Sequence, residues 1–527
     1  MNEDRFDKVK PNVILITDHT DTVFLTRSIG PHKIAHELRL SGYEVAVLNF
    51  AHIFSFEEIL HILQNLISAR TLFVGFNNMF YKSIKNQRVV EGQGLVYDEK
   101  EIGTMLPHGK DKNAEITRFI KGLNPNCRTV LGGPTAQDIS LNSDFDFVVI
   151  GYADTSIINL ANYIAGKELL LKSHRSIHGP TIINDSTAAN FDFVNSNLSY
   201  RSYDCILPGE TLTIEISRGC IFKCAFCNYP LNGKKKLDFI KSSESIKSEF
   251  LQNYEKYRIT RYIFSDDTFN DSIEKIQLIH DISKQLPFKL EYWAYVRLDL
   301  LAAHPETIDL MFDSGLRGCH FGIETFNAEV GKRIGKGMPK EKQLAALRYI
   351  KSKWGDQVML HGSFISGLPG ETEESIQETL TELLDENCPL DSWFIQSTRI
   401  QNHIGNPNTE FISKIEQNPE EYGYKNIRPM ENSGYLDWET DFMSRSRAEE
   451  IATQHQLYVQ QSGAVKISGL TSFYIAGLGF DLAHSTNARA NAVDWYAIVI
   501  KKDQRVAEYK QRFYSEFGIP VYSTDRG

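Results

Sequence analysis

The chain has 527 residues, of which 42% are hydrophobic and 24% are charged, a composition typical of an ordinary globular protein. This length allows roughly two to four domains. The 57 basic and 67 acidic residues give a formal net charge of −10, which argues against a protein that coats nucleic acid non-specifically.

The apolar runs and the cysteines set further limits. No apolar run approaches the roughly 20 residues that a membrane-spanning helix needs, and the first ten residues are polar and charged, so we expect no membrane span and no secretory signal. Three of the seven cysteines lie in one short stretch, which does not fit a disulfide framework. We therefore expect a cytoplasmic protein with reduced thiols.

Strands and helices alternate from residue 11 to about 166. We expect strands at 13–16, 45–48, 72–76, 129–131 and 147–150. This alternation predicts a doubly wound parallel sheet in an N-terminal domain at 1–166. Ligands of such sheets bind beyond the carboxyl ends of the strands. Gly132, Gly133 and Gly151 follow the fourth and fifth strands and are candidate ligand contacts, although glycines there could serve tight turns alone.

Two stretches interrupt this alternation. An insertion at 77–113, with a hairpin expected at 88–97, follows the third strand and would cover a ligand or only decorate the surface. The segment 167–209 has few periodic apolar positions and reads as an irregular linker.

Strands and helices alternate again between 210 and 399. The six expected strands lie at 212–216, 262–265, 290–296, 318–323, 358–365 and 393–396. Repeated β/α units place catalytic groups at the carboxyl ends of the strands. After residue 400 the pattern changes, and we expect a mostly helical C-terminal domain at 400–527.

Three cysteines, Cys220, Cys224 and Cys227, directly follow the first of these six strands in a C-x3-C-x2-C spacing. Thiolates this close together are good ligands for soft metals and iron–sulfur clusters. Three cysteines can hold three irons of a [4Fe–4S] cluster and leave the fourth iron open. A zinc site, which needs a fourth ligand not found within roughly thirty following positions, and a chance group of buried thiols stay open as alternatives.

The cysteine spacing, with Phe226 before the last cysteine, resembles the signature of the radical S-adenosylmethionine (SAM) superfamily. In that superfamily the open iron binds the amino and carboxylate groups of SAM, and an electron from the cluster cleaves SAM to a 5′-deoxyadenosyl radical. The resemblance implies an open partial (β/α)6 barrel, the three cysteines as cluster ligands and Phe226 near SAM. It also implies a substrate and an electron donor such as a flavodoxin or ferredoxin.

The ends of the next two strands extend the resemblance. Ser265, Asp266 and Asp267 end the second strand in an Asp-Asp-x-Phe stretch, which implies contacts with the SAM amino group. Arg297 ends the third strand and would pair with the SAM carboxylate or with the substrate. Helix capping by Asp267 and an exposed salt bridge of Arg297 are the structural alternatives.

The fourth and fifth strand ends complete the series. Glu324 ends a Gly-Ile-Glu stretch, which implies a contact with the SAM ribose or amino group. Gly367 begins the stretch Gly-Leu-Pro-Gly-Glu-Thr, whose backbone meets adenine in the superfamily. The resemblance thus extends over about 200 residues.

The N-terminal domain resembles the cobalamin-binding domain that precedes the barrel in B12-dependent members of the superfamily. The matching residues are Gly132-Gly133-Pro134 and Gly151, each after a strand. The stretch Asp18-His19-Thr20-Asp21 departs from the Asp-x-His-x-x-Gly motif of members with an axial histidine.

These resemblances, and the departures from the family motifs, leave three possible functions. If cobalamin binds, the implied reaction is methyl transfer to an unactivated carbon. Without cobalamin, the implied enzyme abstracts hydrogen or rearranges its substrate. The alternative from another class is a metal-bearing nucleic-acid-binding module, against which the acidic charge weighs. The sequence does not identify the substrate.

Overall fold

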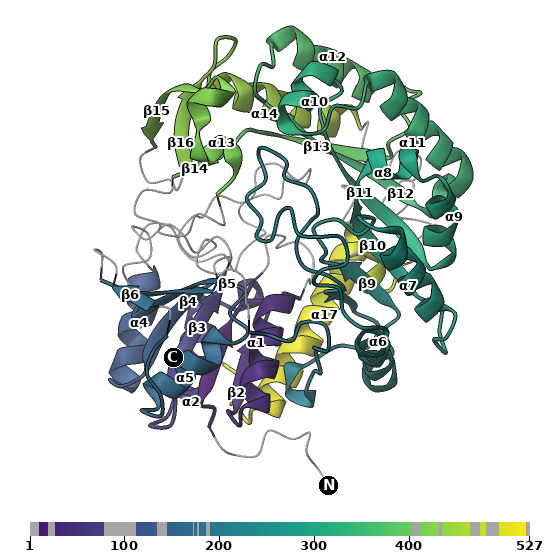
Figure 1. Ribbon diagram of the computed structural model, residues 1–527. Coiled ribbons are helices and arrows are strands. Elements are labelled where there is room, and N and C mark those ends of the chain that lie inside the picture. Colours follow the sequence, from purple (N-terminus) through teal and green to yellow (C-terminus); the bar gives the residue numbers. More distant parts are fainter. Residues whose placement is uncertain are drawn as a thin grey trace.

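The fold comes from a computed structural model, which describes residues 10–18, 27–77, 112–133, 145–171, 173–175, 179–185, 190–402, 412–430, 435–463, 475–480 and 495–522. Two sheets, one from each half of the chain, lie side by side and are joined by the C-terminal helix (Figure 1). In the described ranges, every helix is too short or too polar to cross a lipid bilayer.

The N-terminal sheet has the strand order β2-β1-β3-β4-β5-β7-β6. Its strands are β1 (Val13–Ile16), β2 (Val45–Leu48), β3 (Phe73–Asn77), β4 (Arg128–Gly132), β5 (Phe147–Gly151), β6 (Ser173–Arg175) and β7 (Thr181–Asp185). Only β6 is antiparallel to its neighbour. The predicted doubly wound sheet is confirmed. The segment 167–209, however, adds β6 and β7 to this sheet, where the sequence predicted an irregular linker.

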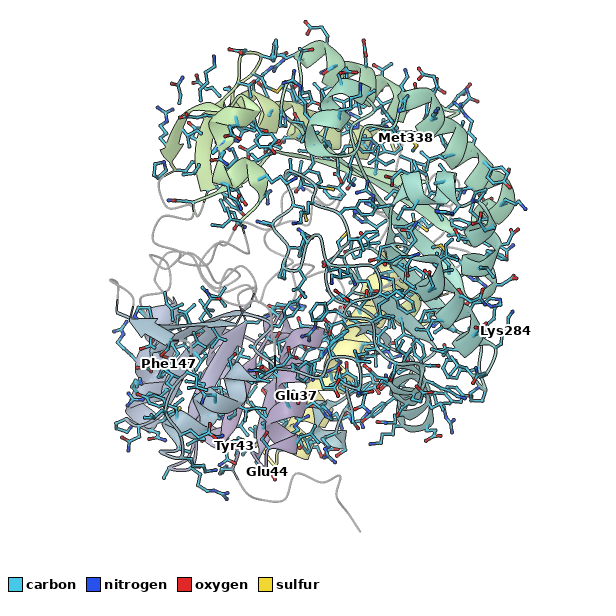
Figure 2. All side chains as sticks on the ribbon, viewed as in Figure 1. Glu37, Tyr43, Glu44, Phe147, Lys284 and Met338 are labelled. Carbon is cyan, nitrogen blue, oxygen red and sulfur yellow. The ribbon has the colours of Figure 1, made fainter. Side chains whose placement is uncertain are left out.

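Helices cover both faces of this sheet, and the strands are apolar along their length for that reason. The helices are α1 (Ile29–Leu40), α2 (Phe56–Leu66), α4 (Lys112–Leu123) and α5 (Ser156–Ile164). Helices α1 and α5 pack on one face, and α2 and α4 pack on the other. Figure 2 marks Tyr43 and Phe147, two core residues of the face that α1 and α5 cover.

The second sheet has the order β13-β12-β11-β10-β9-β8, with every neighbouring pair parallel. Its strands are β8 (Thr211–Ile214), β9 (Arg261–Phe264), β10 (Glu291–Val296), β11 (Leu316–Glu324), β12 (Met359–Ser366) and β13 (Ser392–Ser397). The first and last strands do not pair, so the sheet is an open partial barrel, as predicted.

Helices cover the outer face of this barrel (Figure 1). They are α6 (Ser243–Tyr257), α7 (Ile273–Ser283), α8 (Leu298–Ala303), α9 (Glu306–Asp313), α10 (Ala328–Ile334), α11 (Lys340–Trp354) and α12 (Glu373–Leu384). Alternate residues of β10, such as Tyr292 and Ala294, join this core, so the residues between them face the opposite side.

The C-terminal region is divided between the two halves. A small antiparallel sheet of β14 (Ile400–Gln401), β15 (Lys425–Pro429) and β16 (Tyr435–Glu439) follows the barrel, with α13 (Lys414–Gln417) and α14 (Arg445–Ser462) beside it. The last helix, α17 (Trp495–Glu516), returns to the N-terminal sheet, where Tyr509 and Phe513 pack in the same core as α2. The predicted insertion hairpin at 88–97 lies outside the described residues.

Candidate functional site

The loop after β8 carries the three clustered cysteines and folds back on itself. Gly219 has a φ of +72°, and a Cβ there would lie 2.6 Å from the carbonyl oxygen of Leu231. The carbonyl of Cys220 accepts a hydrogen bond from the amide of Gly233 at 2.7 Å. The loop therefore needs a residue without a side chain directly before the first cysteine.

Each of the three thiols has a polar side chain within hydrogen-bond distance. The pairs are Cys220 with Thr268 (Sγ–Oγ1, 3.2 Å), Cys224 with Arg297 (Sγ–Nη1, 3.3 Å) and Cys227 with Asn232 (Sγ–Nδ2, 3.1 Å). The partners come from three segments: the loop after β9, the end of β10 and the cysteine loop itself. The folded barrel thus surrounds the thiols with groups that can donate to a thiolate.

Burial raises the pKa of the Cys220 thiol and raises that of Cys227 to about 11. Both free thiols are therefore protonated at neutral pH and are poor nucleophiles. A bound metal reverses this balance, because its charge stabilises the coordinating thiolate. The donor set fits a metal centre better than a catalytic nucleophile.

A zinc site and an iron–sulfur cluster arrange their ligands differently. Among the described residues, no group of three or more His, Cys, Asp or Glu side chains converges to hold a single metal ion. A zinc ion needs its ligands around one centre, whereas an iron–sulfur cluster is bound by cysteines on different irons. A [4Fe–4S] cluster on the three cysteines stays a prediction of their spacing in the sequence.

Asp266, a predicted SAM contact, is fully buried and bound to the protein itself. Its carboxylate accepts hydrogen bonds from the amides of Ile216 and Ser217 at 2.9 and 3.1 Å and from the Ser217 hydroxyl at 2.6 Å. Lys275 adds an ion pair at 3.3 Å. Asp266 therefore holds the backbone that leads into the cysteine loop.

Asp267 and Ser265 lie on either side of Asp266 and are half-buried. Burial raises the pKa of Asp267 to about 7, and the nearby charge of Asp266 adds to the shift. Within the described part of the chain, the Asp267 carboxylate has no hydrogen bond or ion pair, which leaves it available to a ligand. The Ser265 hydroxyl donates to the carbonyl of Ile214 at 3.2 Å.

Arg297 lies at the end of β10 and contacts the cysteine loop. Its guanidinium binds Asp299 through Nε and Nη2, at 3.0 and 2.7 Å, and lies 3.8 Å above the centre of the Phe222 ring. Burial opposes its charge, but the contacts with Asp299 and Cys224 outweigh burial and raise the pKa of Arg297. The salt bridge of the structural alternative is present, but its arginine is buried, because Arg297 is only 7% exposed whereas the Asp299 side chain is 39% exposed.

Glu324 ends β11 at a bulge in the pairing with β12. Its backbone has a φ of +68°, a left-handed conformation that is uncommon for a residue with a side chain. Its carboxylate pairs with Lys336 at 3.0 Å and accepts from the Ser363 hydroxyl at 3.4 Å. The strained strand end places a buried charged pair at the carboxyl edge of the barrel.

Gly367 follows β12, and both of its backbone polar groups have partners in the protein. Its amide donates to Glu371 at 2.6 Å, and its carbonyl accepts from Thr398 and Tyr424 at 2.9 Å each. A Cβ at Gly367 would lie 2.5 Å from the Trp438 ring. Close packing therefore requires a glycine here. An adenine that contacts Gly367, as predicted, would share its amide or carbonyl with the protein partners that these groups already have.

A cavity of about 680 Å³ lies between the carboxyl edge of the N-terminal sheet and the cysteine loop. The sheet contributes an apolar floor that includes Leu15, Phe76 and Val149. Glycines of three neighbouring strands also line it: Gly75 lies within β3, and Gly132, Gly133 and Gly151 lie at the ends of β4 and β5. The opposite wall includes Phe226, Asn228, Tyr229 and Ile365. The glycines leave a shelf without side chains, where a large flat ligand could lie against the backbone.

A buried ionic network joins this cavity to the cysteine loop. Arg218 binds Asp154, which follows β5, at 2.6 Å, and binds Glu215 at 2.8 Å. Lys33 of α1 pairs with the same Glu215. Burial opposes both charges, but the ion pairs outweigh it, lowering the pKa of Glu215 and raising that of Arg218. The network therefore links the N-terminal sheet to the residue two positions before Cys220.

Sequence reasoning missed these linking residues and two of the thiol partners, Thr268 and Asn232. Arg218 and Glu215 stand directly before the cysteines, so their position was a usable signal. Lys33 and Asp154 gave none, because only the packing of the two sheets brings them to Glu215 and Arg218.

Residues 214–383 match the sequence model of the Radical SAM superfamily. An uncharacterized methyltransferase from Pyrococcus horikoshii is 27% identical over 284 residues, which cover 50% of this chain and 59% of that protein. A tRNA-2-methylthio-N(6)-dimethylallyladenosine synthase from Clostridium botulinum is 24% identical over 336 residues, covering 59% of this chain and 66% of that enzyme. The chain thus aligns with less than two thirds of either relative.

Two solved structures have a similar fold over almost the whole chain. The radical SAM methyltransferase TsrM from Kitasatospora setae, with tryptophan and a SAM analogue bound, has a TM-score of 0.62 at 15% identity, over 94% of this chain and 100% of that one. The cobalamin-dependent radical SAM enzyme OxsB has a TM-score of 0.57 at 15% identity, over 97% of this chain and 72% of that one. The expected radical SAM domain and the α/β fold of two parallel sheets with a helical C-terminal region are confirmed.

Proposed function

Since this chain carries a radical SAM domain, we propose that it binds a [4Fe–4S] cluster through Cys220, Cys224 and Cys227 and cleaves SAM reductively. The observation that carries this proposal is the gathering of the three cysteines at the carboxyl edge of an open six-stranded parallel barrel. When bound there, the cluster supplies the electron that cleaves SAM. An external electron donor, such as a flavodoxin or ferredoxin, must then reduce the cluster.

We further propose that a cobalamin occupies the cavity and supplies a methyl group for transfer to a carbon of the substrate. The glycine shelf and the apolar floor suit a large flat ligand, and the cysteine loop forms the facing wall. A pocket that is mostly apolar with a few polar groups is typical of cofactor sites. The similarity to a cobalamin-bound structure of TsrM and to the cobalamin-dependent OxsB supports this assignment.

The chain's own residues position the reactants. Asp266 and Lys275 hold the backbone before the cysteines. Glu324 and Asp267 present carboxylates near the barrel mouth, where they would bind the amino or hydroxyl groups of SAM. With SAM and substrate bound, the two facing domains would keep water from the cavity between them, which protects a reactive radical from side reactions.

The cluster is tested by anaerobic reconstitution with iron and sulfide. The wild type should hold about four irons per chain and form 5′-deoxyadenosine when reductant is added. A Cys224→Ala variant should lose that product. Cys388→Ala, which removes a buried thiol of the barrel core, is the matched control and should keep both properties. Full activity of Cys224→Ala would overturn the proposal.

The cobalamin is tested with hydroxocobalamin and desalting. We expect the wild type to keep a corrinoid spectrum. A Gly132→Leu variant should lose it with unchanged iron content, because a Cβ at Gly132 has no neighbour closer than 3.9 Å and the side chain would fill the cavity. Gly122→Leu on α4, where a Cβ meets nothing within 4 Å, is the control. A wild type that keeps no corrinoid would favour the cobalamin-free radical enzyme.

A further inference from the structure

The three thiols of the cysteine loop do not share the same kind of partner. The Thr268 hydroxyl has one hydrogen, and it also lies 2.8 Å from the carbonyl of Asp267, so it can serve only one acceptor at a time. Arg297 and Asn232 reach their sulfurs through nitrogens that can only donate. These two contacts are therefore permanent donors to a thiolate.

Arg297 is held in this position from several sides. Two of its guanidinium nitrogens bind the Asp299 carboxylate, the third lies 3.3 Å from the Cys224 sulfur, and the Phe222 ring stacks on its face. Every guanidinium nitrogen thus already has a partner. This geometry orients the group toward the cysteine loop, whereas the sequence predicted that it would pair with the carboxylate of SAM or with the substrate.

A guanidinium beside a cluster thiolate has an electronic consequence. Reduction adds negative charge to the cluster, and a nearby positive charge with an N–H donor stabilises the reduced form more than the oxidised form. Asp299 offsets part of the charge, but it binds the other edge of the guanidinium and is 39% exposed, so water screens it.

The Asn232 contact acts in the same direction without a formal charge. Its Nδ2 also lies 3.4 Å from the Cys227 carbonyl, which fixes the amide against the loop. Its Oδ1 is buried and has no hydrogen-bond partner within the described residues. In this orientation the Asn232 side chain points its nitrogen at the Cys227 sulfur and leaves its own oxygen without a hydrogen bond among the described residues.

We propose that Arg297 is a positioning residue that raises the reduction potential of the cluster by donating to the Cys224 thiolate, with Asn232 doing the same more weakly at Cys227. The inference rests on the proposed function, because it requires a cluster on these cysteines. It assigns Arg297 to the cluster instead of to SAM.

The experiment is an EPR-monitored redox titration of the reconstituted protein without SAM, on wild type and Arg297→Met. We expect the midpoint potential of Arg297→Met to be more negative than that of the wild type. Arg317→Met is the matched control, because Arg317 is equally buried, at 8% exposed against 7%, and also lies over a phenylalanine ring. The Arg317 guanidinium donates to the carbonyls of Leu316 and Phe312. The midpoint potential of the cluster in Arg317→Met should therefore equal that of the wild type.

Two further variants keep the test decisive if Arg297→Met holds no cluster. Arg297→Lys keeps the charge but loses the fork that binds Asp299, and it should give an intermediate potential. Asn232→Ala should shift the potential in the same direction by a smaller amount. A wild-type potential in every variant that holds a full cluster would overturn the inference.

The SAM affinity of the same samples separates the two roles of Arg297. If Arg297→Met loses most of its SAM affinity while the midpoint potential of its cluster is unchanged, Arg297 binds SAM and the inference is overturned. Failure of the wild type to hold iron or to show a reduced-cluster signal would instead overturn the proposed function.

Discussion

Glu324 combines backbone strain with a buried charge at the carboxyl edge of the barrel. Its φ of +68° costs conformational energy, and its carboxylate is only 6% exposed. The pair with Lys336 compensates the charge but does not require this backbone conformation. Backbone strain of this kind clusters at sites where a side chain is aimed at a ligand. We therefore propose that Glu324 contacts SAM.

A Glu324→Gln variant should bind SAM at least about tenfold more weakly, because a hydrogen bond to a charged group contributes roughly 1.5–3 kcal/mol. Gln keeps the side-chain shape and the same tolerance for the left-handed backbone, so the loop should stay in place. The measurement is equilibrium SAM binding to the reconstituted protein. Glu329→Gln on the exposed face of α10, whose side chain is 80% exposed, is the control. Equal affinities of the two variants would contradict the assignment.

At the level of elements, the sequence predicts the regularly alternating strands and helices. It does not predict an isolated strand, or which sheet a helix packs on. The apolar runs at 13–16 and 45–48 become β1 and β2 with unchanged bounds, because a strand buried on both faces must be apolar throughout. Strand β7, at Thr181–Asp185, was missed: its apolar run of Ile182 and Ile183 is short and lies in an irregular context. The destination of α17 could not be predicted, since an amphipathic pattern does not say which sheet it packs on.

The candidate site divides in the same way. The spacing of Cys220, Cys224 and Cys227 and the motif at Glu324 could be read from the sequence, because ligand spacing is local. The burial of Asp266 and the stacking of Arg297 on Phe222 could not, because they depend on how neighbouring strand ends meet in the folded barrel.

The turn after β12 contains a carboxyl group with an unusual charge state. Glu371 is 1% exposed and accepts hydrogen bonds from the amides of Gly367 and Leu368, at 2.6 and 3.3 Å. Burial outweighs these bonds and raises the pKa of Glu371 from its ordinary value of 4.5 to about 8. The folded chain therefore binds this proton more tightly than the unfolded chain does.

This raised pKa predicts a pH-dependent stability. Between about pH 4.5 and 8 the folded state holds the Glu371 proton while the unfolded state has lost it, so stability from this group falls as the pH rises. The total change is on the order of a few kcal/mol. A Glu371→Gln variant has no carboxyl group to ionise and does not lose this stability. The apparent Tm of the variant minus that of the wild type should therefore increase from pH 5.5 to pH 8. Glu374→Gln, at an exposed position of the following helix α12, should show no such gain. If the Tm difference between Glu371→Gln and the wild type were the same at pH 5.5 and pH 8, Glu371 would not hold its proton in the folded state.

At the scale of the molecule, several contacts among the described residues hold the N-terminal sheet against the barrel, and two of them lie at α17 and at the cysteine loop. Helix α17 packs on the sheet while Arg505 and Arg512 donate to the carbonyls of Pro208 and Ile206, just before β8. The ionic network of Asp154, Arg218 and Glu215 makes the second contact, next to the cavity and the cysteines. A ligand in the cavity would thus touch residues that also position the cysteine loop.

An Asp154→Asn variant should loosen both sides of this contact. The change leaves the buried Arg218 charge with one partner instead of two, and breaking a buried pair costs roughly 3–5 kcal/mol. Hydrogen–deuterium exchange should therefore rise in peptides that cover the loop after β5 and in peptides that cover residues 215–220. Asp146→Asn is the control, because Asp146 pairs with Lys121 within the N-terminal sheet domain and is partly exposed. Its exchange should rise locally and leave residues 215–220 unchanged. If Asp154→Asn left the cysteine loop as protected as in the wild type, the sheet and the loop would not be coupled through Arg218.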